Sequence, residues 1–297
     1  MKRILLFSLM LLAAASLKAQ DVTTMTVEEG GTGVYKSVMV SDATLPTHTI
    51  FKPQDMSVFD SSNPIPVLVW GNGACTDSPW EHVRFLNEIA SHGFFVVAVG
   101  TMPEPLDVRP KVGMSPSSKM TDAIEWVIKT NSDPESRYFG KLDVWNIAAA
   151  GMSCGGLMTL DIAKDPRIRT IMICNSGLFK QSNAGTAVPG MPMPAKERLA
   201  EIHTPIIYIL GGSEDIAYEN GMDDFATINH VPAFAANFPV GHGGTYSKPF
   251  GGEFAVVATA WLKWQLKNDA QAGGFFKGNP CGLSQREGWT TDKKNIP

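Results

Sequence analysis

The sequence has few cysteines and no long block of charge of one sign, and both shortages exclude whole classes of protein. Four Cys in 297 residues are too few for a small scaffold held together by disulfides. The 25 basic and 29 acidic residues give a net charge of -4. No run of about five or six like charges provides the electrostatic footprint of a DNA- or RNA-binding protein. We therefore expect no nucleic-acid partner.

Motifs that bind metals or nucleotides are also absent from the sequence. It contains no His-Glu-x-x-His, no Cys-x-x-Cys and no acidic calcium loop. Gly71-Asn72-Gly73 follows an expected strand, but Thr76 stands where a dinucleotide-binding fingerprint needs a third glycine. We expect neither a metal ion nor a cofactor.

The first twenty residues have the layout of a secretory signal peptide. Lys2 and Arg3 precede an apolar stretch over 4–15, and small and polar residues follow over 16–20. The apolar stretch is shorter than the roughly 20 residues that a membrane-spanning helix needs, and no Cys follows it for lipid attachment. We expect residues 1–20 to be removed and the mature chain to be secreted or periplasmic, with no stable membrane anchor.

Short apolar runs alternate with amphipathic stretches along the rest of the chain. Two runs alternate at period two, as half-exposed antiparallel strands do, and the later runs are almost continuously apolar, as in strands buried on both faces. The expected strands are 34–40, 47–51, 65–70, 94–99, 144–150, 170–174, 205–210 and, more weakly, 231–238. The expected helices are 78–91, 117–130, 155–163, 195–202, 217–228 and 250–267.

Strands that alternate with helices predict crossover units and a parallel sheet. The fold class is therefore α/β, a doubly wound, mostly parallel sheet with helices on both faces. No internal repeat or linker-like composition divides the chain. We expect a single domain over 21–297.

Gly151-Met152-Ser153-Cys154-Gly155 carries the strongest chemical signal in the sequence. It directly follows the expected buried strand 144–150 and directly precedes an expected helix. A serine on such a sharp turn needs glycine two positions to either side, because the turn leaves no room for a Cβ. The turn also aims the amide of Cys154 at an oxyanion formed on an acyl substrate. The pattern predicts Ser153 as a nucleophile, and an ordinary glycine-rich turn is the alternative.

A nucleophilic serine needs a base and an orienting acid, which in this arrangement follow in the order Ser, Asp or Glu, His. Asp215 lies in the loop after the strand 205–210, with Glu214 as the competing acid. His242 lies between glycines in a loop before the last helix. The other five histidines are expected at the surface or at helix ends: His48, His82, His92, His203 and His230.

The second oxyanion donor is expected in the loop after the strand 65–70. Gly71 and Gly73 allow this loop to curl toward Ser153, and the amide of Ala74 is the favoured donor. The amide of Gly73 is the close alternative, and a plain tight turn is the other.

The chain resembles the α/β-hydrolase superfamily, and is most similar to a secreted esterase branch with dienelactone-hydrolase-like, chlorophyllase-like and polyester-hydrolase-like members. The resemblance covers the mature chain and is specific at 151–156, 211–215 and 241–244. It implies Ser153 as nucleophile, His242 as general base and then acid, and Asp215 as the residue that orients His242. It also implies an acyl-enzyme that water cleaves.

The chain departs from the polyester hydrolases at Ala74, because they typically place an aromatic residue after the loop glycine. This difference disfavours stacking on an aromatic polymer ring and favours a smaller or differently shaped acyl group.

The cysteines allow one specific hypothesis. Cys75 follows the oxyanion loop and Cys154 follows the nucleophile, so this fold should bring them together, and an oxidising compartment would permit a disulfide. Cys174 lies inside an expected buried strand and is expected to be a small apolar core residue, whereas Cys281 lies in a C-terminal tail that is expected to be irregular. Four cysteines allow three complete pairings, and the sequence alone does not choose between them.

The sequence therefore predicts a secreted serine hydrolase that cleaves small-molecule or polymer-linked carboxylic esters. The alternatives are a serine peptidase of the same fold and a catalytically silent binding protein. Residues 178–195 are expected to form either a Met-lined lid or a surface loop. Removal of residues 1–20 takes away Lys2, Arg3 and Lys18, which leaves 22 basic and 29 acidic residues and a net charge of -7. A protein with this negative net charge attracts a polyanionic substrate poorly, so a neutral ester is the better expected substrate.

Overall fold

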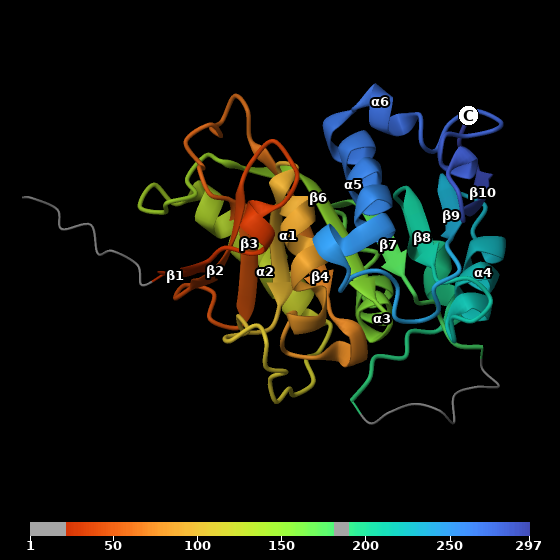
Figure 1. Ribbon diagram of the computed structural model, residues 1–297, viewed down its shortest axis with the longest axis horizontal. Coiled ribbons are helices and arrows are strands. Elements are labelled where there is room, and N and C mark those ends of the chain that lie inside the picture. The colour runs from red at the N-terminus through yellow and green to blue at the C-terminus, as the bar shows by residue number, and fades with distance from the viewer. Residues whose placement is uncertain (1–21, 181–189) are drawn as a thin grey trace, which may run out of the picture.

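A ten-stranded mixed sheet forms the centre of the computed structural model, which describes residues 22–180 and 190–297 (Figure 1). The strand order is β1-β2-β3-β5-β4-β6-β7-β8-β9-β10. The strands are β1 (Val22–Met25), β2 (Ser37–Asp42), β3 (His48–Pro53), β4 (Ile65–Gly71), β5 (Phe95–Val99), β6 (Leu142–Met152), β7 (Ile168–Cys174), β8 (Ile206–Leu210), β9 (Ala233–Asn237) and β10 (Thr290–Lys294). The helices are α1 (Val83–Ser91), α2 (Ser118–Ser132), α3 (Cys154–Asp161), α4 (Tyr218–Thr227), α5 (Gly252–Lys267) and α6 (Ala270–Gly273).

Strands β4 to β9 run parallel to one another, and antiparallel strands extend the sheet at both sides. The predicted fold class is therefore confirmed. Each predicted strand has a counterpart, although the first begins at Ser37 instead of residue 34 because Val34 lies 88% exposed in the preceding loop.

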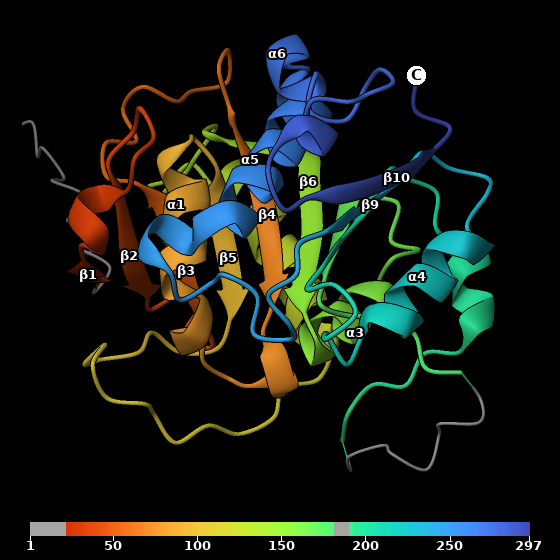
Figure 2. The same cartoon turned by 45° about the vertical axis from the view of Figure 1, so that its right-hand side comes forward.

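The central strands bury both faces, and their side chains alternate between two cores. In β4, Val67 and Val69 pack into one core, whereas Leu68 and Trp70 pack into the other. Helices α2, α3 and α4 cover the first core, and α1 and α5 cover the second. Figures 1 and 2 show α1 and α5 crossing the same side of the central strands.

Two of the predicted helices differ from the structure. The segment predicted at 195–202 forms a 3₁₀ helix over Lys196–Glu201, because few of its side chains reach the core. The helix predicted to begin at residue 78 begins at Val83, after a 3₁₀ turn over Trp80–His82. In addition, the sequence patterns missed β1 and β10 at the two edges of the sheet.

The predicted signal peptide, residues 1–20, lies outside the described residues, as does the middle of the predicted lid, residues 181–189. Among the helices that are described, none is both long enough and apolar enough to cross a bilayer.

Parallel strands bring the functional candidates to one edge of the sheet. Ser153 follows β6, Asn175 follows β7, Asp215 lies in the loop after β8, and His242 lies in the loop after β9. The carboxyl ends of parallel strands lie at the same edge, so side chains distant in sequence converge there.

Candidate active site

Ser153 occupies a sharp turn between β6 and α3. Its φ of 54° and ψ of -118° are unfavourable for a residue that carries a Cβ. Its amide donates to the carbonyl of Cys174 over 2.9 Å, and the Ser176 hydroxyl donates to its carbonyl over 2.7 Å. Neighbouring strands and loops thus hold the serine in a conformation that it would not adopt alone.

The two glycines that flank this turn are required by close backbone contacts. A Cβ at Gly151 would lie 2.1 Å from the carbonyl oxygen of Gly155. A Cβ at Gly155 would lie 2.0 Å from the carbonyl oxygen of Gly71, at the end of β4. Glycine at position 155 therefore lets α3 approach the loop that contains Ala74.

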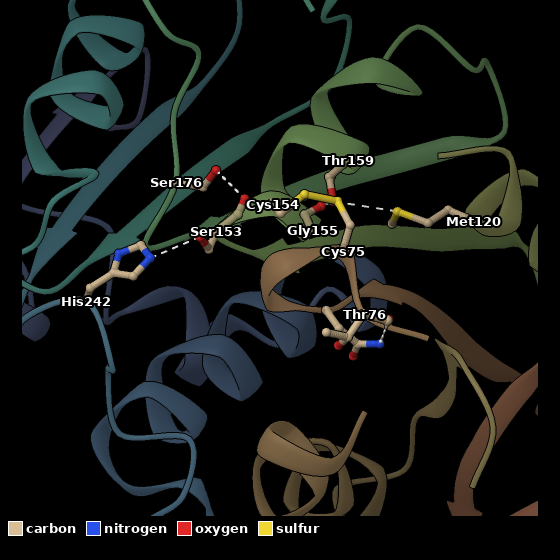
Figure 3. The surroundings of a disulfide bond; sticks show 10 residues. Cys75, Thr76, Met120, Ser153, Cys154, Gly155, Thr159, Ser176 and His242 are labelled. Carbon is tan, nitrogen blue, oxygen red and sulfur yellow. Dashed lines mark hydrogen bonds between the residues drawn. A yellow bond between two sulfur atoms is a disulfide. The ribbon is translucent and has the colours of Figure 1, made fainter. Parts of the chain in front are cut away.

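Ser153, His242 and Asp215 form a continuous hydrogen-bonded chain. The Ser153 Oγ lies 2.9 Å from His242 Nε2, and His242 Nδ1 lies 2.6 Å from Asp215 Oδ1. Figure 3 shows the imidazole facing the serine hydroxyl. The structure thus brings together all three side chains that the sequence nominated, while the competing Glu214 is exposed to solvent.

The surroundings of Asp215 favour its carboxylate form. Burial is the largest single influence and by itself would raise the pKa of Asp215. Hydrogen bonds from His242, the amides of Ala217 and Gly211, and the Asn175 side chain outweigh burial and lower the pKa below its usual value. An ionised Asp215 is suited to orient His242 and to stabilise the imidazolium.

Asn175 is a site residue that the sequence analysis missed. It is fully buried with a φ of 43°, a conformation that Asn adopts more readily than most residues. Its Nδ2 donates to Asp215 Oδ2 over 2.7 Å, and its Oδ1 accepts the hydroxyl of the buried Tyr246. The one feature of the sequence that could have indicated its role is its position directly after a buried parallel strand.

A disulfide joins Cys75 to Cys154, the pair named in the sequence analysis, with the two Cα atoms 5.1 Å apart. It links the loop that contains Ala74 to the residue directly after Ser153 (Figure 3). The hydrogen bonds found within 22–180 and 190–297 use neither the Ala74 amide nor the Cys154 amide. Both expected oxyanion donors therefore remain available. Gly73, the alternative donor, is buried against Met152.

The other two cysteines are free and buried. Cys174 belongs to the core, as expected. Cys281 lies in a C-terminal segment that is less irregular than the sequence suggested, because its sulfur contacts the hydroxyl of Thr291 in β10.

Two cavities flank the Ser153–His242 pair. The smaller, the Ser153 cavity, has a volume of about 90 Å³ and is lined in part by Ser153, Phe179, Met191 and His242. Phe179 and Met191 are described flanks of the predicted lid. The larger, the Trp80 cavity, has a volume of about 660 Å³ and contacts Met152 and Gly243, the chain neighbours of Ser153 and His242. Its wall also contains Trp80.

His82 corrects the expectation that the remaining histidines lie at the surface. Its side chain is buried in the wall of the Trp80 cavity, and its ring centroid lies 5.2 Å from Trp70 and 5.1 Å from Tyr246. Burial lowers the pKa of His82 to about 3, so its ring is neutral at physiological pH. His48 is likewise buried, in β3.

Among the described residues, no group of three or more His, Cys, Asp or Glu side chains is arranged so that it could hold a metal ion.

Residues 77–290 match the PETase family, described as PET hydrolase-like. The chain belongs to this family. PET hydrolase-like proteins are ester hydrolases of the α/β-hydrolase superfamily, so the predicted superfamily is confirmed and the chain is placed among ester hydrolases. The match to the PET hydrolase-like family includes Ser153, Asp215 and His242, and it begins just after Cys75. Among curated proteins, none matches the chain.

Proposed function

We propose that the protein is a secreted serine hydrolase that cleaves carboxylic esters through an acyl-enzyme intermediate. Ser153 is the nucleophile, His242 is the general base and then the general acid, and Asp215 orients His242. The observation that carries the proposal is the hydrogen-bonded chain from Ser153 Oγ through His242 to Asp215, at the edge where the parallel strands end. Such a chain activates a serine that is a weak nucleophile alone.

The geometry supports a two-step reaction. His242 Nε2 takes the proton from Ser153 as Oγ attacks the ester carbonyl, and Asp215 stabilises the imidazolium that forms. The amides of Cys154 and Ala74 donate to the oxyanion. His242 then gives its proton to the departing alcohol, which leaves an acyl group on Ser153. In the second step, His242 activates a water molecule that attacks the acyl-enzyme and releases the acid.

The size of the Ser153 cavity favours a short acyl group. Its volume is about 90 Å³, whereas that of the neighbouring Trp80 cavity is about 660 Å³. Cleavage of an aromatic polyester, the activity named in the family description, is disfavoured because Ala74 provides no ring for stacking. We therefore propose a neutral small-molecule or polymer-linked ester with a small acyl part as the substrate.

Ester and amide substrates assayed side by side test the reaction. Wild-type protein and Ser153→Ala are compared on p-nitrophenyl acetate, p-nitrophenyl butyrate, bis(hydroxyethyl) terephthalate and a peptide anilide. We expect turnover of p-nitrophenyl acetate and p-nitrophenyl butyrate to fall at least about 10³-fold in Ser153→Ala. Ester turnover that persists in Ser153→Ala would refute Ser153 as the nucleophile, and anilide cleavage above ester cleavage would favour a peptidase.

A fluorophosphonate probe separates an enzyme from a silent binding protein of the same fold. We expect the probe to label Ser153 of the folded wild-type protein and to leave Ser153→Ala unlabelled. A fluorophosphonate reacts only with an activated serine. Absence of labelling in wild type would therefore favour a catalytically silent binding protein.

The remaining features of the working protein are also part of the proposal. Residues 1–20 act as a signal peptide, 21–297 form a single α/β-hydrolase domain, and the protein is secreted or periplasmic. The Cys75–Cys154 disulfide supports an oxidising compartment. The protein needs no cofactor, nucleic-acid partner or stable membrane anchor for this reaction.

A further inference from the structure

The Cys75–Cys154 disulfide joins the two chain segments that carry the expected oxyanion donors. Cys75 directly follows Ala74, and Cys154 is itself the residue whose amide lies at the start of α3. The two cysteines are 0% and 4% exposed, so the bond is packed inside the protein between these segments.

The tip of the Ala74 loop adopts a backbone conformation that its side chains disfavour. Ala74 and Cys75 both have a φ of 52°, in the left-handed region that glycine occupies most readily. Both residues carry a Cβ, so each pays a conformational penalty that neighbouring contacts must offset.

Noncovalent contacts hold the base of this loop. The Asn72 side chain donates to the carbonyls of Val99 and Thr76 over 2.6 and 2.9 Å. At the tip, the Cys75 amide donates to the Asn72 carbonyl over 3.1 Å, and the Cys75 carbonyl accepts from the Ser115 amide over 2.8 Å. The disulfide is the covalent link from this tip to α3.

An oxyanion hole depends on donors that are fixed before the reaction begins. Loss of one donor typically lowers kcat by about 10²- to 10³-fold, because the donor stabilises charge that develops in the transition state. Interactions made more strongly in the transition state than with bound substrate affect kcat more than KM. A misplaced Ala74 amide should therefore impair the chemical step and leave substrate binding largely intact.

We propose that Cys75, through its disulfide to Cys154, is a positioning residue that holds the Ala74 and Cys154 amides together as one oxyanion hole. This inference rests on the proposed serine hydrolase function. It assigns to the bond a role in the rate of the chemical step, beyond any contribution to the stability of the fold.

The main test compares wild type with Cys75→Ser and Cys75→Ala. For p-nitrophenyl acetate, we expect kcat to fall about 10- to 100-fold in both variants and KM to stay within about three-fold. A trifluoromethyl ketone forms a tetrahedral oxyanion on the serine, and its inhibition constant should rise by a factor similar to the loss of kcat/KM. The control is Cys281→Ser, which removes a free thiol and should leave kcat and the inhibition constant unchanged.

Three results would overturn the inference: kcat of the Cys75 variants within two-fold of wild type, a loss confined to KM, or an unchanged inhibition constant for the ketone. Failure of the proposed function is distinguishable, because wild type and Ser153→Ala would then show equal esterase activity.

Reduction of the folded wild-type protein provides a second measurement if the variants fail to fold. Dithiothreitol gives two electrons and two protons to the Cys75–Cys154 bond. Two protein thiols form and the reductant closes into its own cyclic disulfide. We expect kcat of the wild-type protein to fall upon reduction and to recover upon reoxidation, with unchanged far-ultraviolet circular dichroism. A fully reduced protein, verified by thiol alkylation and intact mass, that retains kcat would refute the proposal.

Discussion

Asp215 combines burial with a complete set of hydrogen bonds, and this combination explains why it is suited to orient His242. One oxygen faces His242 and the Ala217 amide, and the other faces Gly211 and Asn175. The Asn175 side chain in turn accepts from Tyr246. The position of the imidazole is therefore fixed by a network that reaches into the second core.

Replacement of Asp215 by Asn should affect catalysis far more than folding. The amide keeps the shape of the carboxylate, but it favours the wrong histidine tautomer and cannot stabilise the imidazolium, so we expect kcat for p-nitrophenyl butyrate to fall by about 10⁴-fold. Steady-state kinetics provide the measurement. The control is Glu214→Gln, the exposed neighbour, which should retain wild-type kcat. Equal losses in the two variants would contradict the assignment of Asp215.

The buried His82 should make the protein less stable in mild acid. Its pKa is about 3 in the folded protein, against about 6.5 in the unfolded chain. Between these values the unfolded chain binds a proton that the folded protein excludes, so stability falls as the pH decreases from 6.5 toward 3. At pH 5 this protonation of the unfolded chain lowers the free energy of unfolding by about 2 kcal/mol.

Urea unfolding at pH 7 and pH 5 tests this linkage. The difference in unfolding free energy between the two pH values should be about 2 kcal/mol smaller in His82→Phe than in wild type. His203→Phe, at an exposed position, controls for the loss of a histidine as such. An identical pH dependence of wild type and His82→Phe would contradict the prediction.

At the scale of elements, the contact between β4 and α3 places Ser153 relative to the Ala74 loop. In Gly155→Ala, the new Cβ would lie 2.0 Å from the Gly71 carbonyl oxygen, which cannot move without displacing β4. We expect a loss of stability of at least about 1–3 kcal/mol, measured as a lower thermal midpoint. In the control Gly243→Ala, the added Cβ has no heavy atom within 4 Å. Equal thermal midpoints for Gly155→Ala and Gly243→Ala would show that the contact with Gly71 does not exclude a side chain at position 155.

Trp289, directly before the C-terminal strand β10, packs the start of this strand against the rest of the fold. Trp289 is 5% exposed and stacks on Phe238 with a centroid distance of 5.0 Å, and its Nε1 donates to Glu253 over 2.9 Å. Trp289→Ala should lower the unfolding free energy by about 3–5 kcal/mol. Trp145→Ala is the control, because Trp145 is 81% exposed, and its effect should stay within about 0.5 kcal/mol. Equal urea midpoints for the two variants would exclude this anchoring role.

The elements that the sequence predicted correctly are those whose apolar pattern reflects burial. β4 is apolar throughout because both of its faces are covered, and the Ser153 turn was recognisable because its glycines meet a steric demand. In contrast, β10 has the sequence Thr-Thr-Asp-Lys-Lys, which carries no apolar alternation because the strand lies at an edge.

The roles of Asn175 and His82 depended on tertiary contacts that no local pattern contains. Asn175 matters because Asp215 and Tyr246 reach it from distant loops. His82 is buried because Trp70 and Tyr246 enclose it. Sequence order and loop context were sufficient to nominate Ser153, Asp215 and His242, whereas these supporting residues required the packed structure.

At the scale of the whole molecule, removal of the proposed signal peptide, residues 1–20, should leave the fold intact. β1 begins at Val22, so a cut that leaves Gln20 or Asp21 as the first residue removes none of the described structure. After export from a bacterial host, N-terminal sequencing should begin at Gln20 or Asp21 and intact mass should fall below the 32.1 kDa of the full chain. Exported protein with the mass of the full chain would contradict cleavage.

The position of β10 at one edge of the sheet has a consequence for how the chain is made. β10 pairs with β9 through Thr290–Lys294, although α5 and α6 separate the two strands in the chain. The outer edge of β9 therefore stays unpaired until residues 290–294 have been synthesised, and its sequence Ala-Phe-Ala-Ala-Asn offers no charge to repel another strand. A nascent chain that has not reached β10 presents this edge to its neighbours, so β10 determines whether the edge pairs within the chain or with another copy.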